Sequence, residues 1–281
     1  MRLAPSSEEV RSRLGEDWPI PGTVDAHAHV FERGFPFAAS CNFRPGLYPV
    51  EYYFAWCQAL GIARSVHVSA ACYGFDNSAT RYALEQCRAN RIPARGVAII
   101  DPEIGFVELE RLASYGFVAA RLATTRIAGL GPETFDTVAR RCLPHRWHVE
   151  INVEESEEWL ALELRIAKFP VPVVFEHLGK MPQGVNSPGL KAVLRLLEKR
   201  ADFALKLSSI ERVAEPAAPV IRLLARNFAD RLMWGSGLPQ PGPGGAPIDD
   251  LSLIATLLES LPDAGTREQV FSANAARVYG L

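Results

Sequence analysis

The feature that most constrains the fold of this chain is a regular alternation of strand-like and helix-like segments. Short apolar runs bounded by turn residues alternate with longer amphipathic runs from residue 23 onward. A strand followed by a helix, repeated many times, implies a parallel sheet covered by helices. Eight such units in about 260 residues predict an α/β (β/α)8 barrel, with an N-terminal extension and an extra C-terminal helix. The expected strands are residues 23–30, 65–70, 94–100, 117–122, 147–153, 171–177, 203–208 and 232–236.

An open, doubly wound sheet is the alternative fold for this pattern. Such sheets usually bind nucleotides through a glycine-rich turn after a strand, and no Gly-x-Gly-x-x-Gly or phosphate loop follows an expected strand here. No linker divides the chain, so we expect a single domain over residues 1–281. The Pro- and Gly-rich stretch 239–247 follows the last strand and is interpreted as an active-site loop.

Composition and charge narrow the range of partners. Apolar residues make up 48% of the chain, charged residues 22%, and the net charge is −2, which argues against nucleic acid or an anionic membrane as a partner. Five cysteines lack any Cys-x-x-Cys spacing, which is typical of reduced thiols in the cytoplasm. Residues 1–18 carry several acidic groups and do not resemble a signal peptide. We expect a cytoplasmic protein with a small anionic substrate and leave its oligomeric state open.

The first expected strand carries three polar side chains at alternate positions. Asp25, His27 and His29 share one face of a regular strand, whereas Val24, Ala26 and Ala28 share the other. Polar groups in a buried strand are costly unless they have partners. A single histidine in a strand is often a satisfied core residue, but a His-x-His pair at the start of a β/α pattern indicates a functional site.

The ends of the other expected strands also carry candidate residues. Active sites of (β/α)8 barrels lie at the C-terminal ends of the strands. The set is rich in imidazoles and cations and poor in carboxylates, which suits an anionic substrate held by arginine and a carbonyl attacked by water under histidine control. Arginine and lysine after a strand can equally be solvated surface charges. The candidates are His27, His29, Tyr73, Asn77, Ser78, Arg121, Arg126, His177, Lys206 and Arg212.

Other polar residues near these strands are expected to be structural. His67 alternates with serines within its strand, which favours a structural role. His145 and His148 precede or begin a strand and therefore lie at the other end of the barrel. Glu176 neighbours His177, so in a regular strand it points to the opposite face, where it packs towards the helices or caps another element.

Several of these motifs resemble the amidohydrolase superfamily, in particular the branch of 2-pyrone-4,6-dicarboxylate lactonase-like barrels. The resemblance runs from Val24 to Tyr279. It rests on the early His-x-His and on the segments Tyr73–Ser78, His177–Lys180, Lys206–Arg212, Trp234–Ser236 and Asn274–Gly280.

The resemblance implies roles for several residues. In that branch the histidines line the reacting carbonyl, which places His27, His29 and His177 there in this chain. Arginines after the fourth and seventh strands hold substrate carboxylates, which implies this role for Arg121 and Arg212. Arg126 and Tyr48 are looser matches. The implied activity is hydrolysis of a small carboxylated lactone or related cyclic ester.

One position departs from the family pattern. The eighth strand is usually followed by an aspartate that activates water or binds metal, but Gly237 stands at that place, and Gln240 replaces a frequent histidine. Glycine offers no acid, base or ligand. We expect no metal cofactor, although His27, His29 and His177 are also a plausible ligand set for zinc.

Three functions follow from these observations. The first is hydrolysis of a carboxylated lactone. The second keeps the pocket but changes the reaction to decarboxylation, isomerisation or cyclisation, because these steps need no activated water; Gly237 favours it. The third is a catalytically silent barrel that binds a small anion or a protein, since fold alone does not establish activity.

Overall fold

The structure, a computed structural model, describes residues 4–39, 41, 45–124, 131–210, 216–239 and 248–281. Arg126, Arg212, Gln240 and most of the expected loop 239–247 lie outside these residues.

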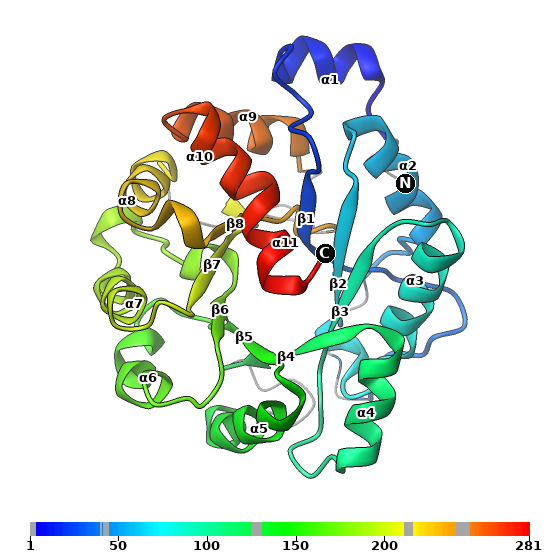
Figure 1. Ribbon diagram of the computed structural model, residues 1–281, viewed down its shortest axis with the longest axis vertical. Helices are drawn as coiled ribbons and strands as arrows, with labels where there is room; N and C mark the ends of the chain where they lie inside the picture. The colour runs from blue at the N-terminus through cyan, green and yellow to red at the C-terminus, as the bar shows by residue number, and fades with distance from the viewer. Residues whose placement is uncertain (1–3, 40, 42–44, 125–130, 211–215, 240–247) are drawn as a thin grey trace.

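Eight parallel strands form the centre of the molecule, each paired with the next along the chain (Figure 1). A bridge between Ala28 and Leu238 joins the first strand to the segment after the last one, so the strands close into a ring. The predicted (β/α)8 barrel is thus confirmed. The strands are β1 (Val24–Ala28), β2 (Arg64–Val68), β3 (Ala94–Ala98), β4 (Phe117–Ala123), β5 (His148–Asn152), β6 (Val173–Phe175), β7 (Ala204–Leu207) and β8 (Leu232–Trp234).

Helices surround the ring because each carries an apolar stripe that packs on the outer face of the strands. In the described part of the chain, eight helices each follow a strand: α2 (Val50–Leu60), α3 (Ser78–Ala89), α4 (Phe106–Tyr115), α5 (Phe135–Cys142), α6 (Glu158–Ile166), α7 (Pro188–Lys199), α8 (Ala218–Phe228) and α9 (Asp250–Ser260). Short 3-10 turns lie at Ala71–Tyr73, Pro132–Thr134, Leu143–His145, His177–Gly179, Gly184–Asn186 and Ala229–Arg231.

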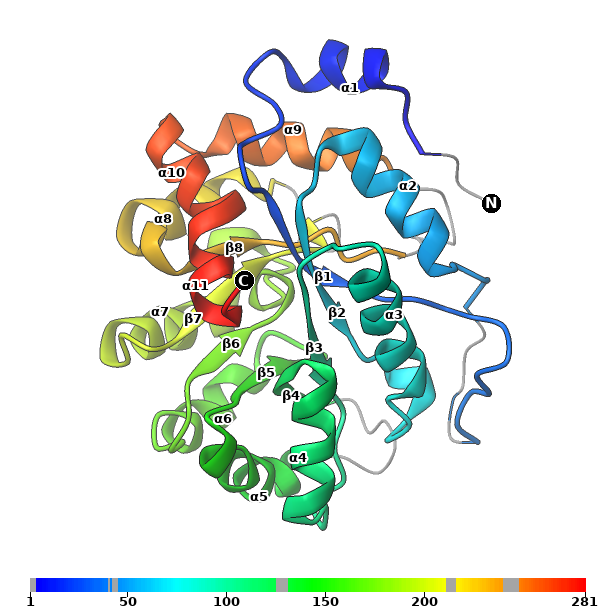
Figure 2. The same ribbon diagram turned by 45° about the vertical axis from the view of Figure 1, so that its right-hand side comes forward.

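The two ends of the chain add helices to this plan. The N-terminal helix α1 (Ser7–Leu14) lies outside the barrel against α2 and α9 (Asp250–Ser260) (Figure 2). The expected last helix is instead three consecutive pieces, α10 (Ala264–Glu268), a π-helix (Gln269–Ala273) and α11 (Asn274–Tyr279). Tyr279 from α11 packs among the interior side chains near the strand starts, with Val24 and Met233. The C-terminal helix therefore covers the end of the barrel opposite to the predicted site.

A β-bulge in β1 changes the predicted direction of its side chains. Asp25 is paired with Ser65, but Ala28 is paired with His67, so β1 has one residue more than β2 over this stretch. The Asp25 carboxylate bonds to Tyr53 of α2, whereas His27 contacts Lys206 in the barrel. The expectation that Asp25 and His27 share one face is therefore wrong.

The end of β6 corrects a second expectation. The strand ends at Phe175, and His177 adopts a φ of 52°, in the left-handed region. Strand alternation does not extend through this turn, so Glu176 and His177 both reach the interior. Glu176 is buried against Arg121 rather than packed towards the helices, as the sequence had suggested.

Candidate active site

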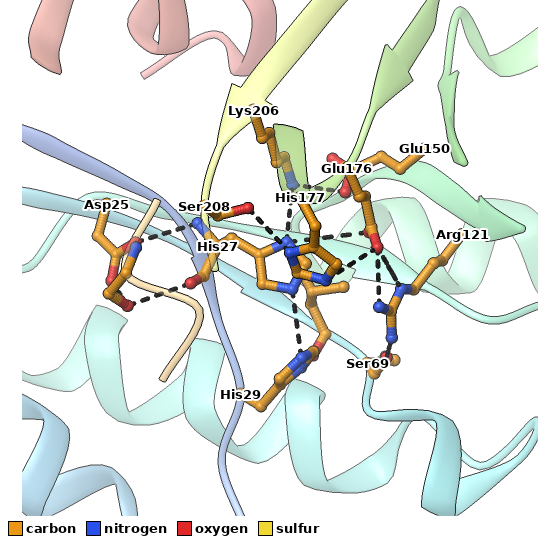
Figure 3. Close-up of polar contacts among 12 residues, drawn as sticks. Asp25, His27, His29, Ser69, Arg121, Glu150, Glu176, His177, Lys206 and Ser208 are labelled. Carbon is orange, nitrogen blue, oxygen red and sulfur yellow. Dashed lines mark hydrogen bonds and ion pairs between the residues drawn. The ribbon is translucent and has the colours of Figure 1, made fainter. Parts of the chain in front are cut away.

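Three imidazoles converge where β1 and β6 end (Figure 3). The Nε2 atoms of His27 and His29 lie 3.2 Å apart, and the His27 and His177 ring centroids lie 4.6 Å apart. All three side chains are buried. The structure thus brings together the three histidines that the sequence selected as catalytic candidates.

Backbone and hydroxyl groups orient these rings. His29 Nδ1 lies 2.7 Å from the carbonyl oxygen of Val68, in β2. His177 Nδ1 lies 3.0 Å from the Ser208 hydroxyl, directly after β7. Burial lowers the pKa of His29 to about 3, with Arg121 contributing further. Burial, followed by the charge of Lys206, also holds the pKa of His27 well below its usual value. His27 and His29 are therefore neutral at neutral pH.

A buried ion pair flanks the histidines on one side. The Arg121 guanidinium donates to both carboxylate oxygens of Glu176 over 2.8–3.1 Å. Burial raises the pKa of Glu176, and Arg121 works against that rise. Arg121 was predicted to bind a substrate carboxylate, and in this structure its main partner is a carboxylate of the protein itself. Sequence reasoning missed this role of Glu176.

A second buried ion pair lies deeper in the barrel. Lys206 donates to Glu150 over 2.5 Å, and its Nζ atom lies 3.4 Å from His27 Nδ1. Burial opposes ionisation of Glu150, but Lys206 and His148 outweigh it and hold its pKa below the usual range. Glu150 was also missed, although a glutamate between two apolar residues of an expected strand was a signal that it has a buried partner.

The other predicted residues lie around this centre. Tyr73 packs against Phe31, which in turn packs against His29. Tyr48 pairs through its backbone with Phe31. The Asn77 side chain bonds to Ser69 and to the backbone of Ile99, so it braces β2 against β3.

The remaining predictions have simpler outcomes. Ser78 begins α3, with its N–H bonded to Asp76. His67 lies outside the ring near Ser65 and Cys87, as a structural role requires. Arg126 and Arg212 lie outside the described residues, so their carboxylate-binding role stays a prediction.

Some of these side chains could supply ligands to a metal ion. In the described part of the chain, one group of possible ligands emerges, His27, Glu176 and His177, with ligand atoms within 4.8 Å of one another. However, Arg121 engages both oxygens of Glu176, and the Lys206 Nζ faces His27. A divalent cation here would meet two cations already bound to its ligands, at a large Coulomb cost. As arranged, these residues do not fit a metal.

Gly237, where the resemblance implied an aspartate, lies next to His27. Its N–H donates to the His27 carbonyl oxygen over 2.7 Å, and its φ is 72°. Glycine adopts this left-handed conformation without strain. The structure therefore puts a glycine, and no carboxylate, at the position for which the resemblance implied an aspartate.

Fold and site together define a (β/α)8 barrel with a histidine-centred site at the strand ends, as in barrel hydrolases. The Amidohydrolase family model matches residues 24–281, and the chain belongs to this family. It is 30% identical to a 2-pyrone-4,6-dicarboxylate hydrolase of Comamonas testosteroni, over 92% of this chain and 90% of that protein. It is 27% identical to a D-galactarolactone isomerase of Agrobacterium fabrum, over 98% of each. An apo crystal structure from Agrobacterium tumefaciens superposes with a TM-score of 0.83 at 25% identity, covering 92% of this chain and 96% of the other.

Among the described residues, no helix combines the length and apolar character needed to cross a membrane.

Proposed function

We propose that this protein hydrolyses a small carboxylated lactone. The observation that carries the proposal is the convergence of three buried imidazoles with the cations of Arg121 and Lys206 at one end of the barrel. Such a site places donors and positive charge around a carbonyl whose oxygen becomes negative during attack. The relative from Comamonas testosteroni is, by its name, a hydrolase of a pyrone dicarboxylate, and this supports the same substrate class.

In the proposed reaction, His177 is the acid and base. It accepts a proton from the attacking water while the new C–O bond forms, and the Ser208 hydroxyl holds its ring. His27 polarises the carbonyl, with His29 beside it, and the positive charge of Arg121 and Lys206 stabilises the oxyanion. The ring C–O bond then breaks, and the leaving oxygen takes the proton from His177. Arg126 and Arg212 remain the predicted ligands of the substrate carboxylates.

A panel of carboxylated lactones tests this function directly. Hydrolysis of one member by the purified protein, measured as proton release together with loss of lactone absorbance, is the expected result. No turnover of any member would count against a hydrolase and in favour of a silent, anion- or protein-binding barrel.

We also propose that the reaction needs no metal, which the pairing of Arg121 with Glu176 and the place of Lys206 support. Hydrolysis is expected to be unchanged after dialysis against a chelator and after addition of zinc. The measurement is the initial rate before and after each treatment, with metal content followed by mass spectrometry. A rate that falls with the chelator and returns with zinc would contradict the proposal.

Isomerisation of a lactone is a second candidate, and Gly237 is the observation that favours it. Transfer of an acyl group between two hydroxyls of one sugar acid needs no activated water, so the missing carboxylate would be no loss. The D-galactarolactone isomerase among the relatives supports this alternative. The two reactions are separated by their products, because isomerisation returns a lactone without net proton release, whereas hydrolysis gives an open-chain acid.

The substitution Gly237→Asp tests the role of this position. It is expected to introduce or raise lactone hydrolysis, because it restores a carboxylate beside the His27 backbone. The left-handed φ costs an aspartate about 1 kcal/mol, which the fold can tolerate. Gly237→Asn, of similar shape but without charge, is the control. Equal rates in the two folded variants would show that the missing carboxylate is not decisive.

A cytoplasmic location is proposed as well. All five cysteines are thiols in this structure, which supports a reducing compartment. Fractionation of cells that make the protein, followed by immunodetection, tests the location.

A further inference from the structure

A continuous line of polar contacts runs through the barrel from α11 to the histidines. The Tyr279 hydroxyl donates to Glu150 Oε1 over 2.5 Å, and Lys206 donates to Glu150 Oε2 over 2.5 Å. Lys206 Nζ then lies 3.4 Å from His27 Nδ1, and His27 Nε2 lies 3.2 Å from His29 Nε2. The Lys206, Glu150, His27 and His29 part of the line is seen in Figure 3.

The proton positions along this line can be assigned from its far end. The Val68 carbonyl oxygen can only accept, so the Nδ1 atom of His29 carries a proton. Because the His29 ring is neutral, its Nε2 atom then has a lone pair. The 3.2 Å contact therefore requires a proton on Nε2 of His27.

The same reasoning extends to Lys206. His27 is neutral as well, so a proton on Nε2 leaves a lone pair on Nδ1. That lone pair faces Lys206 Nζ, an ammonium that only donates. Every donor along the line meets an acceptor, and the opposite tautomer of His27 would set two N–H groups against each other.

We propose that Lys206 is a positioning residue that fixes His27 in the Nε2–H tautomer. Glu150 holds Lys206 in place through its hydrogen bond, and Tyr279 in turn donates to Glu150. The expected effect of Lys206 on catalysis rests on the proposed function. In this tautomer the Nε2–H of His27, which donates to His29 in the free protein, can turn to the oxygen of a bound lactone carbonyl and polarise it.

The cost of burying Lys206 supports a role beyond packing. The side chain is wholly buried within β7, and its Nζ lies 5.5 Å from the centre of the Tyr279 ring, as in a cation–π contact. Two apolar residues of similar volume, in place of Lys206 and Glu150, would fill this space without the desolvation of two charges. A charged pair at this place is explained if its hydrogen bond to His27 is used.

Nitrogen NMR of the histidine rings tests the proposal. In protein labelled with 15N-histidine, the two-bond spectrum distinguishes the two tautomers, and the His27 signals are identified by their loss in His27→Gln. The wild-type protein is expected to hold His27 in the Nε2–H form. Lys206→Met is expected to give a mixture of tautomers and a kcat at least about tenfold lower, with KM changed less than about twofold. Arg277→Ala, an exposed change on α11, is the matched control and should alter neither.

Several results would overturn the proposal. A proton on Nδ1 of His27 in the wild-type protein would do so without any variant. Unchanged tautomer and kcat in Lys206→Met would do so as well. If Lys206→Met does not fold, the His27 tautomer and kcat are measured in Glu150→Gln instead. This substitution keeps the shape of the Glu150 side chain but removes the charge that holds Lys206. A shifted tautomer in a protein that hydrolyses no lactone would uphold the role of Lys206 and reject the proposed function instead.

Discussion

Replacement of His177 by alanine is expected to lower kcat/KM for a carboxylated lactone by about a thousandfold. A positioned acid or base contributes about 10²–10⁴ to a rate, and no carboxylate at position 237 shares this task. The Ser208 hydroxyl, which bonds to the ring, cannot replace it, because a neutral hydroxyl stays protonated at neutral pH and is a very weak base. The fall is expected mainly in kcat, since His177 acts on the proton that moves during attack.

Steady-state kinetics on a folded variant provide the measurement. His145→Gln is the matched control, since His145 lies before β5 at the opposite end of the barrel and pairs with Glu110. It should keep the parental rate. A His177→Ala variant that retains more than about a tenth of the activity would assign the proton transfer to another group.

The largest effect on stability is expected from Arg121→Met. This change leaves the buried Glu176 carboxylate without its cation, and breaking a buried pair costs about 3–5 kcal/mol. Arg195→Met is the control. Arg195 makes an equally short pair with Glu163 on the surface, where its side chain is 51% exposed and water screens the pair, so its loss should change stability far less.

The pH dependence of the same variant adds a second check. Burial already raises the pKa of Glu176, and removal of Arg121 raises it further. The native variant then holds a proton that the unfolded chain releases as the pH rises, so its stability falls with rising pH. Urea unfolding is expected to show a larger deficit at about pH 8 than at about pH 5. A deficit independent of pH would mean that lost packing, rather than an unpaired charge, destabilises the variant.

Much of the fold follows from sequence because parallel barrel strands are buried on both faces and appear as short apolar runs. The meeting of His27 with His177 was also predictable, since strand ends converge at one end of a barrel. The two ion pairs were not. Their partners, Arg121 with Glu176 and Lys206 with Glu150, are 55 and 56 residues apart, and no local pattern specifies such pairing.

Local backbone irregularities account for the wrong expectations. The bulge in β1 turned Asp25 away from His27, and the left-handed turn at His177 brought Glu176 inward. Both depend on tertiary contacts: Asp25 bonds to the backbone and hydroxyl of Ser236, which follows the last strand. Strand alternation alone cannot reveal them.

That contact between Asp25 and Ser236 also has a consequence for how the enzyme is made. It joins residues 211 positions apart. The Gly237 N–H donates to the His27 carbonyl oxygen at the same place, where β1 meets the segment that follows β8. Contacts of such long range form late and slowly, because the entropy of a long loop is lost before the contact is gained. His27 therefore reaches its native position only when the last strand docks. Catalytic competence should appear during refolding in step with ring closure, later than the bulk of the helical signal.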